Sequence, residues 1–346
     1  MNFDLTEEQN LTRQAIRAFA EKQIAPIARG LDESEEFSVD LTREMADLGL
    51  LGCFVPEKYG GSNMGYMSYA IAIEELARVD ASQAATIAAG NSLGIGPIYY
   101  FGNEKQKQEW LPRLCSGECL AAFGLTEPDA GSDAGSSKTT ATLEGDRWTI
   151  NGHKIFITNS ACSLTGVIIV QAVTGRREDG KPELSCLIVP SGTPGFTAKE
   201  MKHKMMWRAS STGELFFDDC VVPRANLLGK RGDGFHQMLA TLDGGRLSIA
   251  AMAWVGLRRL LNWLHNTPIH ASNLDGPSLH FKSTPSSWPT WRWRSNWPEI
   301  CSTRSAGCGR TPVPSPKRRP WQNCSVPRLC AVAFTTQCNF TEDTGS

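Results

Sequence analysis

A short segment, Phe123–Asp133, gathers residue types that suit the binding of a flat, phosphate-bearing ligand. Its eleven residues include an aromatic anchor, two hydroxyls, a proline turn and a glycine. Backbone N–H groups and hydroxyls in such a loop can hydrogen-bond to phosphate oxygens. Further along the chain, Gly152–Asn159 places a second aromatic residue, Phe156, close to a second hydroxyl, Thr158. Together the two segments predict a site for such a ligand.

Each of these residues has a simpler explanation when it is taken alone. Aromatic residues such as Phe123 and Phe156 more often belong to a hydrophobic core than to a cofactor site. Thr126 by itself is typical of a turn. A lone Arg246 is typical of an exposed or ion-paired helix position. Only the joint order of the residues favours a ligand site.

The bulk properties exclude several classes of protein. A chain of 346 residues predicts two or three domains, and a net charge of −1 provides no basic surface for nucleic acid. The sequence has no run of eighteen apolar residues, so we expect no membrane span, and its acidic start is unlike a secretory signal. We expect a cytoplasmic protein, or a mitochondrial matrix protein if the source is eukaryotic, although no transit peptide is recognisable.

The eleven cysteines do not form a recognisable metal motif. Cys115 and Cys119 have a zinc-like gap, but no second pair follows them. We therefore expect free thiols in a reducing compartment and no metal site.

The elements that would position the ligand segments change in type along the chain. Residues 1–119 predict helices, with a capping box at Thr6–Gln9, a second helix capped by Asp40, and further helices at 68–79 and 103–114, the last ending near Pro112. Short apolar runs between 120 and 231 predict strands, and Asn151-Gly152 predicts a hairpin turn. Residues 234–257 return to a helical pattern.

This order predicts an α+β fold. We expect an N-terminal all-α domain (1–119), a middle antiparallel β-barrel or sandwich domain (120–231) that binds the ligand, and the first helix (232–257) of a C-terminal helical bundle. We expect that this bundle is not completed.

Composition changes sharply in the last part of the chain. Residues 1–253 contain three tryptophans and the last 93 residues contain seven. Residues 1–257 carry 24 basic and 32 acidic residues, a net charge of −8, whereas residues 258–346 carry eleven basic and four acidic ones. The segment 258–346 shows neither helical period nor strand alternation, so we predict no fold for it.

Several segments, in order, resemble the acyl-CoA dehydrogenase family. Phe101–Glu118 is similar to the end of the family's N-terminal helical domain, and Phe123–Ser132 and Phe156–Asn159 are similar to its two flavin-binding signatures. Arg208–Pro223 resembles the end of its β-domain, and Asp243–Arg246 resembles the start of its C-terminal domain. The resemblance covers about residues 1–257.

The resemblance implies FAD as cofactor and a role for each site residue. Phe156 would border the isoalloxazine ring, Thr158 would lie near flavin N5, and Thr126 with the backbone of 123–125 would hold the pyrimidine end. Gly131 and Ser132 would approach the phosphates. The implied cofactor contacts are Phe123, Leu125, Thr126, Gly131, Ser132, Phe156 and Thr158, and the implied substrate contacts are Ser132, Asp243 and Arg246.

The resemblance also implies a reaction in fatty acid metabolism, the α,β-dehydrogenation of an acyl-CoA to the 2-enoyl-CoA. A glutamate of the C-terminal domain removes the α-proton and the β-hydrogen leaves as hydride to FAD. Electrons pass to an electron-transfer flavoprotein, and the intact family forms homotetramers. The glutamate, an Arg-x-x-Phe-Gly flavin contact and a Gly-Gly-Tyr-Gly loop are not visible in this sequence.

The segment 258–346 suggests an altered reading frame. Tryptophan has a single codon, and a shift of one base can turn residues 270–277 into Arg-Ile-Gln-Phe-Gly-Arg-Pro and residues 338–345 into Gln-Phe-Tyr-Gly-Gly-Tyr-Gly. Both resemble the missing family segments, in order and in one frame. We expect that the segment is translated out of frame, that the glutamate base would lie beyond Ser346, and that this polypeptide is inactive.

Two other hypotheses stay open at the level of sequence. A non-catalytic binding protein could use the same scaffold together with its basic C-terminal segment. A relative that is an acyl-CoA oxidase or flavin monooxygenase would react with oxygen instead of passing electrons to a flavoprotein.

Overall fold

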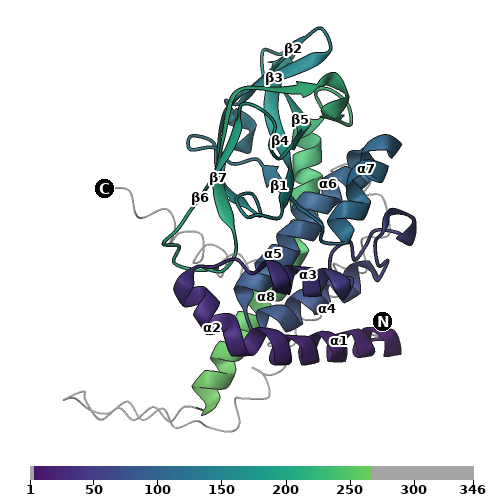
Figure 1. Cartoon of the computed structure of the whole chain (residues 1–346), viewed down its shortest axis with the longest axis vertical. Helices are drawn as coiled ribbons and strands as arrows, with labels where there is room; N and C mark the ends of the chain where they lie inside the picture. The colour runs from purple at the N-terminus through teal and green to yellow at the C-terminus, as the bar shows by residue number, and fades with distance from the viewer. Residues whose placement is uncertain (1–3, 267–346) are drawn as a thin grey trace, which may run out of the picture.

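The computed structural model describes the backbone of residues 4–266 and the side chains of residues 4–258. Figure 1 shows a helical layer below a sheet, with the long helix α8 running beside both. Helices come first in the chain, strands follow, and a helix returns after the last strand. The expected order of elements is therefore confirmed. The rest of the segment for which a shifted frame is expected, residues 267–346, lies outside the described residues.

The helical part begins where the sequence predicts it. Thr6 accepts the amide of Gln9, and the Gln9 side chain accepts the amide of Thr6, which completes the expected capping box. The helices are α1 (Glu7–Phe19), α2 (Ala25–Ser34), α3 (Val39–Asp47), α4 (Gly65–Ala77), α5 (Ala81–Ala89), α6 (Gly96–Phe101) and α7 (Glu104–Cys115), with π-helical segments at Ala20–Ile24 and Gly90–Ile95.

Two details of the helices differ from expectation. Ser38 rather than Asp40 caps α3, because the Ser38 hydroxyl accepts the Leu41 amide while Asp40 lies in the first turn. Helix α7 does not end near Pro112 but continues to Cys115, since a proline in the last turns removes one helical hydrogen bond without ending the helix.

The strands form one mixed eight-stranded sheet with the order β6-β7-β3-β2-β4-β5-β8, and β1 pairs with β4 beside this path. Two pairings, β1 with β4 and β2 with β4, are parallel, and the path of hydrogen-bonded strands stays open. The expected antiparallel barrel is therefore corrected to an open mixed sheet. The strands are β1 (Leu120–Gly124), β2 (Thr140–Glu144), β3 (Arg147–Thr158), β4 (Thr165–Arg176), β5 (Pro182–Pro190), β6 (Phe196–Glu200), β7 (Thr212–Pro223) and β8 (Leu227–Leu228).

The expected hairpin turn at Asn151-Gly152 is wrong, because both residues lie inside β3. Asn151 exchanges two hydrogen bonds with Asp219 of the neighbouring β7, and the register shifts by a bulge at this point. A Cβ atom at Gly152 would approach the Thr139 hydroxyl to 2.4 Å, so close strand packing explains the glycine. The turn that joins β2 to β3 is Gly145-Asp146.

Strands β4 and β5 are buried on both faces. Val167 and Ile169 of β4 pack into a core shared with the helices, whereas the alternate residues Ile168 and Val170 pack into a second core with β3 and β7. A strand with two buried faces loses the polar half of its alternation, which explains the continuous apolar runs in the sequence.

Helix α8 (Gly234–Asn266) joins the two layers. It contacts α4, α5, α6 and β5, and its Met238, Ala251 and Val255 belong to the core shared by helices and sheet. The helix begins at the expected residue and continues beyond the expected end at 257.

We expect Gly94→Ala to destabilise the joint between helices and sheet. A Cβ atom at Gly94 would lie 2.7 Å from the Ala121 carbonyl oxygen and 2.9 Å from the Ala121 Cβ in β1. The overpacking should lower the free energy of unfolding by about 1–3 kcal/mol in urea titrations. Gly30→Ala is the control: a Cβ there meets nothing within 4 Å in α2, so it should add about 0.4–1 kcal/mol. Equal stability of the two variants would contradict this account.

Candidate functional site

The loop between β1 and β2 leaves its tip free for a ligand. It makes a tight turn in which Glu127 and Ala130 exchange two backbone hydrogen bonds of 3.1 Å. Gly131 and Ser132 follow this turn and are exposed. No hydrogen bond joins either of them to another described residue. Their amides and the Ser132 hydroxyl are therefore available as donors.

The second predicted segment, at the end of β3, is strained. Phe156 and Asn159 have φ of 61° and 64°, the left-handed region that non-glycine residues rarely adopt. A bulge between Lys154 and Ile157 interrupts the pairing with β7 here. Phe156 is 56% exposed, so burial offsets only part of a backbone cost of roughly 1–2 kcal/mol. Such strain at an exposed aromatic residue points to a functional position.

Two hydrogen bonds bring the loop and the strand together. The Ile155 amide donates to the Thr126 carbonyl at 2.9 Å, and the Lys154 ammonium donates to the Leu125 carbonyl at 3.1 Å. Thr126 therefore lies beside the bulge that carries Phe156. Leu125, Thr126 and Thr158 are half-buried in these two segments.

A buried ion pair links the two segments. The Lys154 ammonium and the Glu127 carboxylate are 2.7 Å apart, with side chains 0% and 4% exposed. Glu127 also accepts the Ser137 hydroxyl and the amides of Lys138 and Thr139, at 2.7 and 3.1 Å for the amides. Glu127 lies at the start of the loop that carries Gly131 and Ser132, and its carboxylate is hydrogen-bonded to residues 137–139 at the end of that loop.

The charges of this pair depend on each other. Burial disfavours the carboxylate most, but the Lys154 charge and the hydrogen bonds outweigh burial and lower the pKa of Glu127 to about 2. Burial lowers the pKa of Lys154, and the Glu127 charge opposes that shift.

Asn159 fixes the other end of the bulge to the helices. Its side-chain amide donates to the Thr86 carbonyl of α5 at 3.0 Å, and its backbone amide donates to the Ser211 carbonyl at 2.9 Å. The Thr165 hydroxyl donates to the Asn159 carbonyl at 2.9 Å. Phe156 and Thr158 are thus held between two anchored residues, Lys154 and Asn159.

The other predicted residues fall into two groups. The Phe123 ring is buried in β1, so only its backbone faces a ligand. Asp243 and Arg246 lie on α8, are 68% exposed each, and hydrogen-bond to each other. A Cβ at Gly135 would lie 3.5 Å from the Phe235 ring, so the start of α8 borders the loop.

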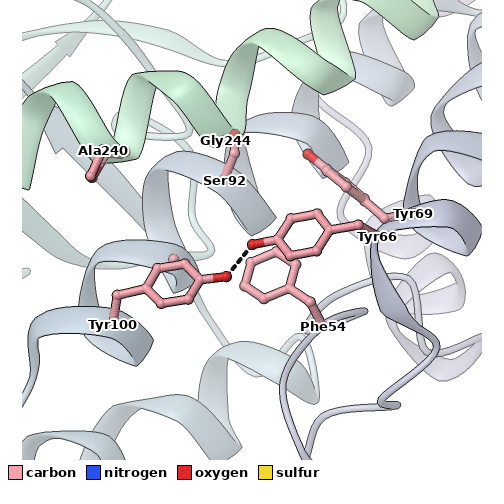
Figure 2. A pocket seen from close by; sticks show the side chains of 9 residues that line it. Phe54, Tyr66, Tyr69, Ser92, Tyr100, Ala240 and Gly244 are labelled. Carbon is pink, nitrogen blue, oxygen red and sulfur yellow. Dashed lines mark hydrogen bonds between the residues drawn. The ribbon is translucent and has the colours of Figure 1, made fainter. Parts of the chain in front are cut away.

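A hollow elsewhere in the molecule has an aromatic wall. It lies between α4, α6 and α8, and Figure 2 shows the Tyr66 and Tyr100 hydroxyls hydrogen-bonded to each other beside it. None of the predicted site residues lines it. Its walls are Phe54, Tyr66, Tyr69, Ser92, Gly96, Tyr100, Ala240, Thr241 and Gly244.

Metal-binding clusters and membrane-spanning helices are both absent from the described residues. No group of three or more histidine, cysteine or acidic side chains in this part of the chain is placed to hold a metal ion. No helix between residues 4 and 266 combines the length and apolar character of a membrane span.

Comparison with known proteins identifies the family. The acyl-CoA dehydrogenase N-terminal domain matches residues 6–118, and the acyl-CoA dehydrogenase middle domain matches residues 122–220. A solved butyryl-CoA dehydrogenase of Megasphaera elsdenii is 33% identical, with a TM-score of 0.79 over 99% of this chain and 90% of that one. The chain belongs to the acyl-CoA dehydrogenase family.

Two more relatives show how far the likeness extends. A probable acyl-CoA dehydrogenase of Bacillus subtilis is 50% identical over 253 residues, which are 73% of this chain and 66% of that protein. The match thus spans slightly less than two thirds of this relative. A solved structure from work on the electron transferring flavoprotein of Acidaminococcus fermentans is 35% identical to this chain. Its TM-score is 0.74 over 89% of this chain and 84% of that one. The acyl-CoA dehydrogenase family, to which these relatives belong by name, is a family of oxidoreductases.

Sequence reasoning missed the residues that hold the acyl-CoA dehydrogenase signatures in place. Glu127 and Lys154 lie inside the two segments but received no role. A signal was present, since Lys154 follows the inward positions Trp148 and Ile150 on an apolar strand, and a charge at an inward position needs a partner. The register bulge concealed it.

We expect the stabilisation provided by Glu127 to disappear in acid. Its folded pKa lies below the ordinary 4.5, so the contribution is present above pH 4.5 and is lost as the pH falls toward 2. The shift corresponds to a contribution on the order of 3 kcal/mol. The difference in free energy of unfolding between the wild type and Glu127→Gln, measured in urea, should therefore shrink below pH 4.5. Asp129→Asn, which removes an exposed ion pair with Lys138, is the control. A difference that stays constant down to pH 3 would contradict the assignment.

Proposed function

We propose that the chain binds FAD between residues 125–132 and 155–159. The observation that carries this proposal is the strained and exposed Phe156 beside Thr126. An aromatic ring held outward at a backbone cost is suited to contact a flat ring system. Its neighbours supply donors for the polar edge of that ring.

The residues present fit the phosphate end of FAD as well. Gly131 and Ser132 offer unpaired amides, and a Cβ built at Gly131 meets nothing within 4 Å of the protein. Protein packing therefore does not require this glycine, whereas close approach of a phosphate would. In this proposal Phe156 borders the flavin ring and Thr158 faces its N5 edge. The full set of contacts is Phe123 and Leu125 through their backbone, Thr126, Gly131, Ser132, Phe156 and Thr158.

The reaction supported by the family is the α,β-dehydrogenation of an acyl-CoA. Bound FAD supplies the acceptor for the hydride that leaves the β-carbon. Ser132 at the loop tip and the exposed Asp243 and Arg246 on α8 would orient the acyl-CoA. The Phe235 ring at the start of α8 borders the loop, so Ser132 and the α8 residues belong to neighbouring parts of the structure. The butyryl-CoA specificity of the Megasphaera protein supports a thioester substrate.

The electron acceptor in this proposal is an electron-transfer flavoprotein, which the likeness to the Acidaminococcus structure supports. The cysteines of the described residues, Cys115 and Cys119 among them, are free thiols. Free thiols support a reducing compartment such as the cytoplasm. The homotetramer of the intact family stays a prediction.

We further propose the domain division 1–119, 120–231 and 232–257, supported by the junctions between α7 and β1 and between β8 and α8. The segment 258–346 differs in composition from the rest and would not build the family's C-terminal domain. The catalytic base and the second wall of the substrate site belong to that domain in the resemblance. This chain should therefore bind FAD without completing turnover.

Replacement of Phe156 separates ligand binding from folding. We expect Phe156→Asn to leave the free energy of unfolding unchanged or to raise it by up to about 1 kcal/mol, because asparagine tolerates the left-handed region. The dissociation constant for FAD, measured by quenching of flavin fluorescence, should rise about tenfold. Phe216→Asn removes another exposed ring from the sheet and serves as the control. Equal FAD affinity of Phe156→Asn and wild type would contradict the proposed site.

An assay of the purified chain tests the proposed loss of turnover. The flavin-loaded protein should show no bleaching of flavin absorbance with butyryl-CoA, and no reduction of an electron-transfer flavoprotein. Measurable dehydrogenation would show that the chain supplies its own base. Rapid reoxidation by oxygen after reduction would instead indicate an oxidase, and protein without flavin binding would indicate a non-catalytic binding module.

A further inference from the structure

We propose that Lys154 and Glu127 are positioning residues that turn the Thr126 amide N–H outward as a donor for the ligand. The inference rests on the proposed function, because it assigns the bound flavin a specific hydrogen-bond donor. Neither residue touches the ligand in this account. Each acts through the orientation of the Leu125–Thr126 peptide.

The geometry of one peptide plane carries the first step. The Lys154 ammonium donates to the Leu125 carbonyl at 3.1 Å, so this oxygen faces the protein interior. In a planar trans peptide the following N–H points opposite to the carbonyl, and the described chain has no cis peptide bond. The Thr126 N–H is therefore directed away from Lys154. It donates to no other described residue, which leaves it for a ligand.

A second hydrogen bond prevents rotation of the next peptide. The Thr126 carbonyl accepts the Ile155 amide at 2.9 Å. Leu125 and Thr126 therefore both direct their carbonyl oxygens toward the β3 side, toward Lys154 and Ile155. The N–H of Thr126 is therefore held on the opposite side, facing away from the Lys154 and Ile155 backbone of β3.

Glu127 is needed because Lys154 cannot remain charged in this place alone. The Lys154 side chain is fully buried, and a buried ammonium without a counter-ion loses its proton or leaves its position. Glu127 supplies the negative charge at 2.7 Å and is itself held by Ser137 and the amides of Lys138 and Thr139. The same carboxylate thus closes the loop that presents Gly131 and Ser132.

Stability alone does not account for the pair. Replacing a buried ion pair by apolar groups of similar volume is often neutral or stabilising, because desolvation of the charges opposes their attraction. The feature that an apolar pair would not reproduce is the hydrogen bond from Lys154 to the Leu125 carbonyl. Orientation of the Leu125–Thr126 peptide is therefore the effect to test.

The test compares two double variants of the full chain. Glu127→Gln with Lys154→Met removes both charges and the bond to Leu125 but keeps the side-chain volumes. Glu75→Gln with Arg17→Met is the control, because this pair is also 2.7 Å apart and lies between α1 and α4, with Glu75 2% and Arg17 49% exposed. Flavin fluorescence and absorbance are titrated with FAD, and urea unfolding is measured for both.

We expect the first variant to bind FAD about 10- to 100-fold more weakly than the wild type, as for the loss of a preorganised backbone donor that leaves a buried acceptor of the ligand unpaired. Its flavin absorbance maximum at saturation should shift, since the pyrimidine end loses a hydrogen bond. The control variant should keep the wild-type affinity and spectrum at a comparable loss of stability. Wild-type affinity and spectrum in the first variant would overturn the inference.

A ligand-free readout keeps this inference separate from the proposed function. If the wild type binds no FAD, the proposed function fails, and amide hydrogen exchange then decides the positioning role. The Ile155 amide, which donates to Thr126, should exchange several-fold faster in the first variant than in the control. Equal exchange in the two variants would overturn the positioning role.

Discussion

The buried ion pair between Lys154 and Glu127 is the interaction on which the arrangement of the site depends. It connects two segments that are separated by more than twenty residues of sequence, and both of its side chains are buried. The exposed elements of the site, Phe156 and the tip at Gly131, make few contacts of their own. Their positions are therefore set by buried groups beneath them. A site of this kind is preorganised before any ligand arrives.

The layer of helices contributes a second constraint. Asn159 joins the end of β3 to α5, and the closely packed Gly94 joins the π-helical segment to β1. Both strands that carry the signatures are thus fixed to the same layer. Helix α8 extends this frame, because it contacts both layers and places Asp243 and Arg246 on its exposed surface. The two family domains match residues 6–118 and 122–220, which contain both signature segments and the helices that anchor them.

Local patterns predicted the elements well where the cause was local. The capping box at Thr6 and the start of α8 depend on neighbouring residues only, and both were predictable. The Asn151-Gly152 turn was wrong, because Asp219 and Thr139, distant in sequence, decide that conformation. The left-handed Phe156 and the partner of Lys154 escaped prediction for the same reason. Strand order and pairing determine them, and periodicity does not encode either.

We propose that residues 4–258 build a preorganised site for the flavin ring and its phosphates. An experimentally determined structure of the full chain with FAD tests this most directly. We predict that the isoalloxazine ring lies against Phe156, with its pyrimidine edge at the Thr126 amide and the phosphates at Gly131 and Ser132. A flavin bound at another surface, with Phe156 still exposed to solvent, would contradict the account.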